Sequence, residues 1–361
     1  MPSGNKINFC LYILASTTFF ILVYLFLSGR ASAPNRQSDQ LDKTITSEEV
    51  TNLNSNDQIG VKSGDELTFA IAGDMMFGRS INYYFQGKKL PEVLGNLDKS
   101  IFLDKDLSLV NLEGPISKTA FVPDNTPNNL VFNFPPKTAE VLNNLGVNAV
   151  GLANNHTNNQ GNIGVVSTID LLTEQHILPI GSERDFNSSS VGLFQKGNIK
   201  VSVIAINCLE VNTDIVPVIK QQKDQGNLVV VFPHWGIEYE RLHSAAQEKL
   251  AHRWIDNGAG MIIGSHPHVM QDAESYQGKP IFYSLGNLLF DQTFSSATQR
   301  GLVITGEITV DQIRLNLNPI VSKSLKPELL IETEKEQVID KYFDEFRQIR
   351  DATNSLRFDL K

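Results

Sequence analysis

This chain of 361 residues has two cysteines, fewer basic than acidic residues, and none of several short enzyme motifs. Cys10 and Cys208 are the two cysteines, and Cys10 lies in an apolar run, so no internal disulfide framework can form in the rest. A net charge of −9 argues against nucleic-acid binding, which needs a basic surface. The lack of a Gly-x-Ser-x-Gly elbow, a glycine-rich phosphate loop and a Cys-x-x-Cys pair argues against serine hydrolysis, nucleotide binding and a zinc ribbon.

The N-terminal 30 residues contain a long apolar run. Residues 7–27 carry no charge, and about 20 such residues suffice to span a bilayer. Lys6 and Arg30 flank the run, so the positive-inside bias is weak. Residues 31–33 resemble a signal-peptide cleavage site, but the run exceeds the usual signal core. We therefore expect residues 1–30 to be an uncleaved single-pass anchor, with a cleaved signal as the alternative. In either case, we expect the remainder to lie outside the cytoplasm.

Residues 31–65 read as a flexible linker. They are rich in Ser, Asn, Gln, Asp and Thr and show no apolar periodicity. Short apolar runs alternate with helical patterns from residue 67 onward, which predicts an α/β layered fold. Strands are expected at 67–72, 107–112, 148–152, 201–206, 228–232, 261–263 and 281–284, and helices at 136–145, 163–174 and 244–257.

The C-terminal third ends with two different patterns. Residues 302–310 and 313–321 predict an antiparallel hairpin, which closes a domain that we place at residues 66–325. Residues 326–361 are assigned to a C-terminal amphipathic helix, because apolar residues fall at helical spacing over 334–356. We expect this helix to pack on its own domain, and the alternative is a partner-binding or membrane-surface helix.

Polar side chains follow the predicted strands. The residues concerned are Asp74, Glu113, Asn155, His156, His234, His266 and His268. Open α/β sheets bind ligands beyond the carboxyl ends of their strands, so these side chains are predicted to share one crevice. Carboxylate, amide and imidazole groups suit Mn, Fe, Zn or Mg. A carboxylate that bridges two ions would form a two-metal clamp, so one or two divalent ions are expected.

Each of these residues also has a purely structural interpretation. Asp74 can be a turn residue, Glu113 a solvated loop charge, and Asn155 with His156 an Asx-type turn. Arg79 follows Asp74 by five residues and suits bidentate binding of a substrate carboxylate or phosphate. It fits a charge on a surface helix equally well.

Six ordered segments together resemble one protein family. They are residues 73–79, 111–115, 152–156, 234–239, 266–269 and 283–287, the last followed by Asp291-Gln292. They resemble the CapA family, the poly-γ-glutamate capsule synthesis proteins of bacteria, over about residues 67–303. The resemblance implies a membrane-anchored, extracytoplasmic protein of capsule polymer biosynthesis with a metal-dependent crevice. A metal-dependent phosphoesterase and a non-catalytic scaffold are the alternatives.

The CapA family is itself similar in fold to the calcineurin-like metallophosphatases, which are four-layer α/β/β/α sandwiches. That similarity implies metal-ligand roles for Asp74, Glu113 (bridging), Asn155, His234, His266 and His268, and a transition-state-stabilising role for His156. Met76 departs from the pattern, because the phosphatases carry a metal-binding His at that position. The implied partners are an anionic polymer or phosphoester substrate, the membrane, and other membrane proteins of polymer synthesis.

Overall fold

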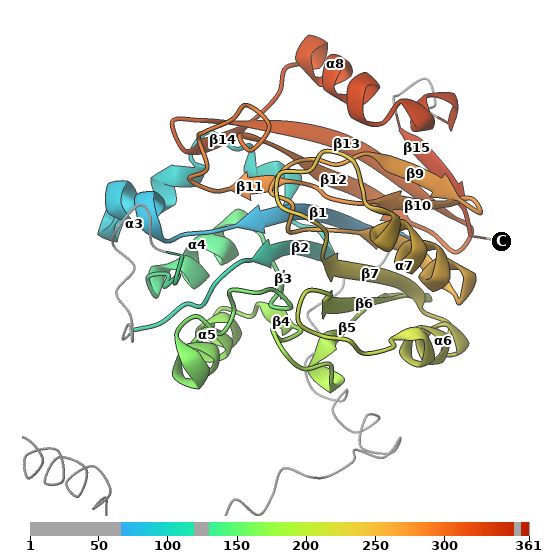
Figure 1. Cartoon of the computed structure of the whole chain (residues 1–361), viewed down its shortest axis with the longest axis horizontal. Helices are drawn as coiled ribbons and strands as arrows, with labels where there is room; N and C mark the ends of the chain where they lie inside the picture. Colours follow the sequence, from blue (N-terminus) through green and yellow to red (C-terminus); the bar gives the residue numbers. More distant parts are fainter. Residues whose placement is uncertain (1–65, 119–129, 350–354, 361) are drawn as a thin grey trace, which may run out of the picture. The chain divides into compact units, whose positions relative to one another are not determined.

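Two β-sheets occupy the centre of the computed structural model, which describes residues 66–118, 130–349 and 355–360 (Figure 1). The predicted anchor and linker lie outside these residues. Within the described ranges, no helix combines the length and the apolar character that a membrane span requires.

The first sheet has nine strands (Figure 1). In spatial order they are β14 (Lys326–Leu329), β13 (Gln312–Lys323), β12 (Arg300–Ile308), β1 (Leu67–Met75), β2 (Leu107–Leu112), β3 (Ala149–Gly151) and β4 (Leu178–Ile180), with β11 (Asn287–Leu289) beside β1 and β15 (Leu356–Asp359) beside β13. Strands β1 to β4 are parallel. The β12–β13 pair is antiparallel, which confirms the predicted hairpin.

The second sheet has six strands. In order they are β5 (Val191–Lys196), β6 (Ile199–Asn207), β7 (Leu228–His234), β8 (Ala259–Ile263), β10 (Lys279–Phe282) and β9 (Ala273–Tyr276). Strands β6, β7 and β8 are parallel. Both sheets therefore have parallel strands whose carboxyl ends can meet along a shared edge.

Helices cover the outer faces of the sheets (Figure 1). The α-helices are α3 (Arg79–Phe85), α4 (Lys137–Leu145), α5 (Gly161–Glu174), α6 (Val216–Asp224), α7 (Ala245–Asp256) and α8 (Glu332–Tyr342); short 3-10 helices span Gly87–Leu94, Lys99–Ile101, Ser188–Ser190 and Asp344–Ile349. Ser244 caps α7 through a reciprocal capping box with Gln247, and Gly146 ends α4 with a φ of 97°. Both helix boundaries follow from these local residues.

Three hydrophobic clusters define the layers. One lies between the two sheets and includes Phe69 from β1 and Val230 from β7. A second packs the other face of the first sheet against α4 and α5, and a third packs the second sheet against α6 and α7. Successive residues of β1 alternate between the first two clusters, as the two-residue period of a strand requires. The layers are thus helices, sheet, sheet and helices.

The C-terminal segment differs from the single long helix that was predicted. The helix α8 ends at Tyr342, and residues Leu356–Asp359 form β15 beside β13. In β15, buried Leu356 and Phe358 alternate with exposed neighbours, which is a strand pattern. Val338 and Ile339 of α8 reach the cluster between the sheets, so the helix does pack on its own domain.

A short connection joins the sheets at one edge. Residues 283–286 run from β10 in the second sheet to β11 in the first. A Cβ atom at Gly73 would lie 1.9 Å from the Gly286 carbonyl oxygen, and one at Gly264 would lie 2.1 Å from the Tyr283 carbonyl oxygen. The connection therefore passes so close to β1 and to the end of β8 that only glycine fits at both positions.

Candidate metal centre

The carboxyl ends of five strands bring the predicted residues together. Asp74 lies near the end of β1, Glu113 follows β2, Asn155 and His156 follow β3, His234 ends β7, and His266 and His268 follow β8. The first three strands belong to one sheet and the last two to the other. The site therefore lies where the two sheets meet at the segment 283–286.

One group of potential ligands consists of Asp74, Glu113 and His268. Their ligand atoms all lie within 4.8 Å of one another, and all three side chains are buried. His268 Nδ1 is 3.2 Å from Asp74 Oδ2, and His268 Nε2 is 3.5 Å from Glu113 Oε1. Asn111 supports the group, because its Nδ2 atom donates to Asp74 Oδ1 at 2.8 Å.

Glu113 is the most costly residue of this group to bury. Its side chain has no solvent exposure, and among the described residues its Oε1 atom has no hydrogen-bond partner. Burial raises the pKa of Glu113 well above its ordinary value, against the attraction of His268. A buried carboxylate costs several kcal/mol unless a cation compensates its charge. Even a neutral buried group that lacks a hydrogen-bond partner costs about 1–3 kcal/mol. The geometry therefore favours a bound cation.

A second group consists of Asn155, His234 and His266. His234 Nε2 lies 2.9 Å from Asn155 Oδ1 and 3.2 Å from His266 Nδ1. Burial lowers the pKa of His234 well below its ordinary value and, together with His268, lowers the pKa of His266 to about 4. Both rings are therefore neutral near pH 7, which is the form that can ligate a metal.

The separations within both groups suit metal ligands. Two ligands about 2.1 Å from one ion, at 90–110° to each other, lie about 3.0–3.4 Å apart. Three of the separations given above come close to this range. They are 2.9 Å for His234 Nε2 and Asn155 Oδ1, 3.2 Å for His234 Nε2 and His266 Nδ1, and 3.5 Å for His268 Nε2 and Glu113 Oε1. Oxygen and imidazole donors at such spacing fit a divalent ion such as Mn, Zn, Fe or Mg.

His156 lies beside the carboxylate group. Its Nε2 atom is 3.9 Å from Glu113 Oε1, and its ring stacks on Phe132 with centroids 4.2 Å apart. His156 Nδ1 is 3.0 Å from Asn159 Oδ1, which also accepts from the Phe132 amide. Nδ1 must therefore donate, which leaves Nε2 as the nitrogen that faces the site. Burial lowers the pKa of His156, although 16% of its side chain is exposed.

Arg79 has a partner that sequence reasoning did not identify. Its guanidinium pairs with Asp291, and Nε lies 3.1 and 3.2 Å from the two carboxylate oxygens. The guanidinium also lies over the rings of Phe132 and Phe290. The prediction that Arg79 binds a substrate anion remains a prediction, and it requires the anion to share Arg79 with Asp291.

Met76 packs in the apolar core beside the first sheet. Its side chain is fully buried in the cluster between the first sheet and its helices, and its sulfur accepts from the Gly78 amide at 2.9 Å. Asn287 instead reaches the carboxylate group, with Oδ1 3.1 Å from His268 Nδ1. Asn111 and Asn287 each lie in one of the six segments, but an asparagine gives no signal in the sequence of which side chain it will contact.

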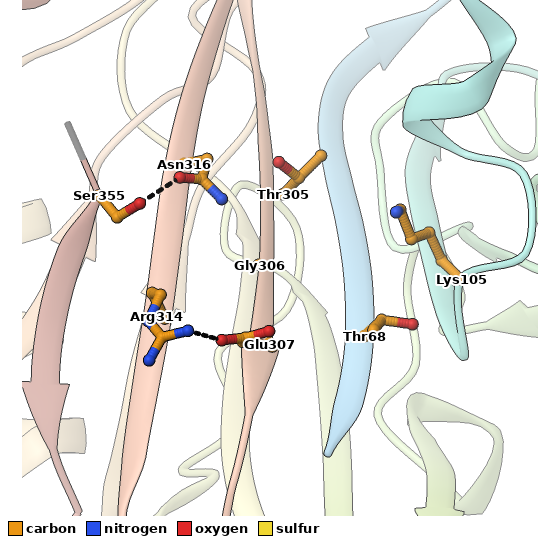
Figure 2. Close-up of a pocket in the computed structure, with 8 residues that line it drawn as sticks. All are labelled: Thr68, Lys105, Thr305, Gly306, Glu307, Arg314, Asn316 and Ser355. Carbon is orange, nitrogen blue, oxygen red and sulfur yellow. Dashed lines mark hydrogen bonds and ion pairs between the residues drawn. The ribbon is translucent and has the colours of Figure 1, made fainter. Parts of the chain in front are cut away.

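A polar cavity of about 370 Å³ lies elsewhere on the first sheet (Figure 2). Most of its lining residues, including Thr68, Glu307 and Arg314, come from β1, β12 and β13. Thr68 is near the beginning of β1, whereas Asp74 is near its end. None of the predicted site residues lines this cavity.

Comparisons with known proteins agree with the motif resemblance. The model of the family described as "Bacterial capsule synthesis protein PGA_cap" matches residues 68–292. The capsule biosynthesis protein CapA of Bacillus anthracis is 28% identical over 298 residues, which cover 71% of this chain and 69% of that protein. The PGA biosynthesis protein CapA of Bacillus subtilis (strain 168) is 27% identical over 299 residues, which cover 74% and 78%.

Among solved structures, a phosphatase from Mycoplasma pneumoniae matches 73% of this chain and 92% of its own, with 15% identity and a TM-score of 0.41. That likeness is too distant to add to the assignment. The family match includes every residue of the candidate metal centre from Asp74 to Asn287. The chain therefore belongs to the family of bacterial capsule synthesis proteins.

Proposed function

We propose that this chain acts outside the cytoplasm, held by its N-terminal anchor, in the biosynthesis of poly-γ-glutamate or a similar capsule polymer through a metal-dependent crevice. The names of its relatives support the polymer class. The observation that carries the metal dependence is the buried Asp74, Glu113 and His268 group with its unsatisfied Glu113 oxygen. A structural core has no reason to retain such an oxygen.

A divalent ion held by these residues would polarise an oxyanion of the polymer or of a phosphoester and activate a water molecule. Asp74, Glu113 and His268 would hold one ion, and Asn155, His234 and His266 a second. The chain is acidic overall, so general attraction of a polyanion is weak. Recognition would be local, through the cation and His156.

The first test measures metal uptake by the full-length chain purified in detergent. After removal of metal with EDTA and incubation with Mn²⁺ or Zn²⁺, we expect one or two ions per chain by elemental analysis. Asp74→Ala combined with His266→Ala should abolish uptake, whereas His176→Asn, at an exposed histidine after α5, should leave it unchanged. A wild-type chain that takes up no transition metal would refute the metal-dependent crevice.

The second test asks whether the crevice is needed for polymer production. Cells whose own gene is replaced by the Asp74→Ala, His266→Ala double variant should make less polymer than cells with the wild-type chain, at equal protein level. Normal polymer production would instead support a non-catalytic scaffold.

A metal-dependent phosphoesterase is the second candidate function, and the placement of His156 favours it. Its Nε2 atom faces Glu113, and 16% of the His156 side chain is exposed, so the ring can contact a substrate oxygen. The Mn²⁺-loaded chain should then hydrolyse a generic phosphodiester such as bis(4-nitrophenyl) phosphate, and His156→Ala should reduce the rate by about 100-fold or more. No hydrolysis above the metal-free control would exclude this activity for that substrate class.

A further inference from the structure

We propose that Asn287 is a positioning residue that orients the His268 ring, so that Nδ1 donates a hydrogen bond and Nε2 is left to bind the metal. The inference rests on the proposed metal dependence. It adds which nitrogen of His268 binds the metal and which residue selects that nitrogen. Asn287 is 3% exposed and begins β11, next to Asp74 in the register of β1 and β11.

The orientation of the Asn287 amide is fixed by its neighbours. Its Nδ2 atom donates to the Thr298 carbonyl oxygen at 2.9 Å and to Gln292 Oε1 at 3.1 Å. A backbone carbonyl can only accept, so Nδ2 must be the atom on that side. Both amide hydrogens are then used, and Oδ1 faces His268 Nδ1 at 3.1 Å as an acceptor.

The acceptor fixes the form of the His268 ring. Nδ1 lies between two acceptors, Asn287 Oδ1 at 3.1 Å and Asp74 Oδ2 at 3.2 Å, and so must carry a hydrogen. Nε2 is 3.5 Å from Glu113 Oε1, which exceeds an ordinary hydrogen bond but suits two ligands of one ion. Metal-binding histidines commonly donate their other N–H to such an oxygen, which fixes the ring and raises its basicity.

The backbone of His268 shows why a positioning contact is needed. Its φ of 59° is in the left-handed region, which costs a residue with a side chain about 1–2 kcal/mol. Tertiary contacts must offset this backbone cost. Contacts to the His268 side chain are also needed to stop its ring from rotating. Asn287 supplies such a contact from a strand rather than a loop, so the ring is held by the sheet itself.

The test compares three variants of the full-length chain in detergent. Asn287→Leu removes the acceptor and keeps the branched shape of the side chain. Asn287→Asp keeps an acceptor oxygen but loses the donor to Thr298. Asn318→Leu is the matched control: Asn318 is a half-buried asparagine on β13 whose Nδ2 also donates to backbone carbonyls, without contact to His268. Mn²⁺ affinity is measured by competition with a fluorescent chelator, and stability by urea denaturation without metal.

Asn287→Leu should weaken Mn²⁺ binding by about 10–100-fold, and Asn318→Leu by less than about twofold. Asn287→Asp should keep the wild-type affinity or exceed it while being less stable. A purely structural role predicts instead that affinity and stability fall together in both variants at 287. Should the Leu variant fail to fold, a folded Asp variant that has lost tenfold or more in affinity overturns the proposal.

The outcomes separate this inference from the proposed function. Metal uptake by the wild-type chain with unchanged affinity in Asn287→Leu would overturn the inference and leave the metal centre intact. A wild-type chain that binds no Mn²⁺ would overturn both.

Discussion

Mn²⁺ binding should strengthen as the pH rises from 6.5 to 8.0, because the folded chain holds a proton that the cation must displace. Burial alone would lower the pKa of His268, but the carboxylates of Glu113 and Asp74 outweigh burial and raise the pKa to about 9. Glu113 also has a raised pKa, because it is buried. Whichever of the two groups carries the proton, the pair keeps one at neutral pH.

The expected magnitude follows from proton linkage. Below the pKa of the pair, an ion bound by Asp74, Glu113 and His268 releases one proton, so the affinity of this group rises tenfold per pH unit, or about 30-fold from pH 6.5 to 8.0. His234 and His266 contribute little in this window, because their lowered pKa values keep them neutral. The affinity can be measured by chelator competition at four pH values, and the proton release by titration calorimetry in two buffers of different ionisation enthalpy.

Without metal, the same proton gives the opposite trend in stability. The pKa of His268 is raised from an ordinary 6.5, so its stabilising contribution is complete below pH 6.5 and is lost as the pH rises toward 9. The free energy of unfolding of the metal-free chain should therefore fall by about 1.4 kcal/mol per pH unit, or about 2 kcal/mol from pH 6.5 to 8.0. Urea denaturation in EDTA measures this fall.

Glu113→Gln tests whether the proton held by Glu113 and His268 causes the pH dependence of Mn²⁺ binding. The substitution removes the carboxylate that most raises the pKa of His268, so the affinity should become nearly independent of pH and weaker by at least about tenfold at pH 8.0. Glu92→Gln, at an exposed position, should retain the wild-type slope. An affinity of the wild-type chain that is flat with pH, or a slope that survives in Glu113→Gln, would refute the reasoning.

Three further substitutions test how the fold supports the site. Asp106→Asn should lower the free energy of unfolding by about 1–3 kcal/mol, because its carboxylate joins β1 to β5, whereas Asp104→Asn at an exposed neighbour should change it by less than about 0.5 kcal/mol in urea denaturation. Gly73→Ala should cost about 3 kcal/mol and also weaken Mn²⁺ binding, measured by chelator competition, because its Cβ overlaps the connection 283–286. Phe346→Ala should cost about 3–5 kcal/mol in the same denaturation assay, because the ring is fully buried between the sheets.

Local residue patterns predicted the elements that carry their own boundary signals. The helix α4 begins after Pro135-Pro136 and ends at Gly146, and α7 begins at its Ser244 cap. The apolar runs at 67–72 and 228–232 are strands that extend slightly further than predicted, to Met75 and His234. In each case the signal is a property of adjacent residues, so it does not depend on the rest of the fold.

Elements that depend on distant partners were not predictable in the same way. The strand β15 forms because Leu356 and Phe358 pack beside β13, whereas the helical spacing that predicted a helix falls on the preceding residues 338–349. The strand β11 has three residues and exists only through its neighbours. The contacts of Asn287 with His268 and of Arg79 with Asp291 likewise join segments that are 19 and 212 positions apart.

The predicted side chains meet only because two sheets approach each other closely at one edge. Asp74 and Glu113 come from the first sheet, and His234 from the second. Motifs can place each residue at a strand end, but they do not encode the spacing between sheets. That spacing depends on the connection 283–286, which passes Gly73 and Gly264 with no room for a side chain. The two glycines therefore matter to the site as much as its ligands do, although neither can bind a metal through a side chain.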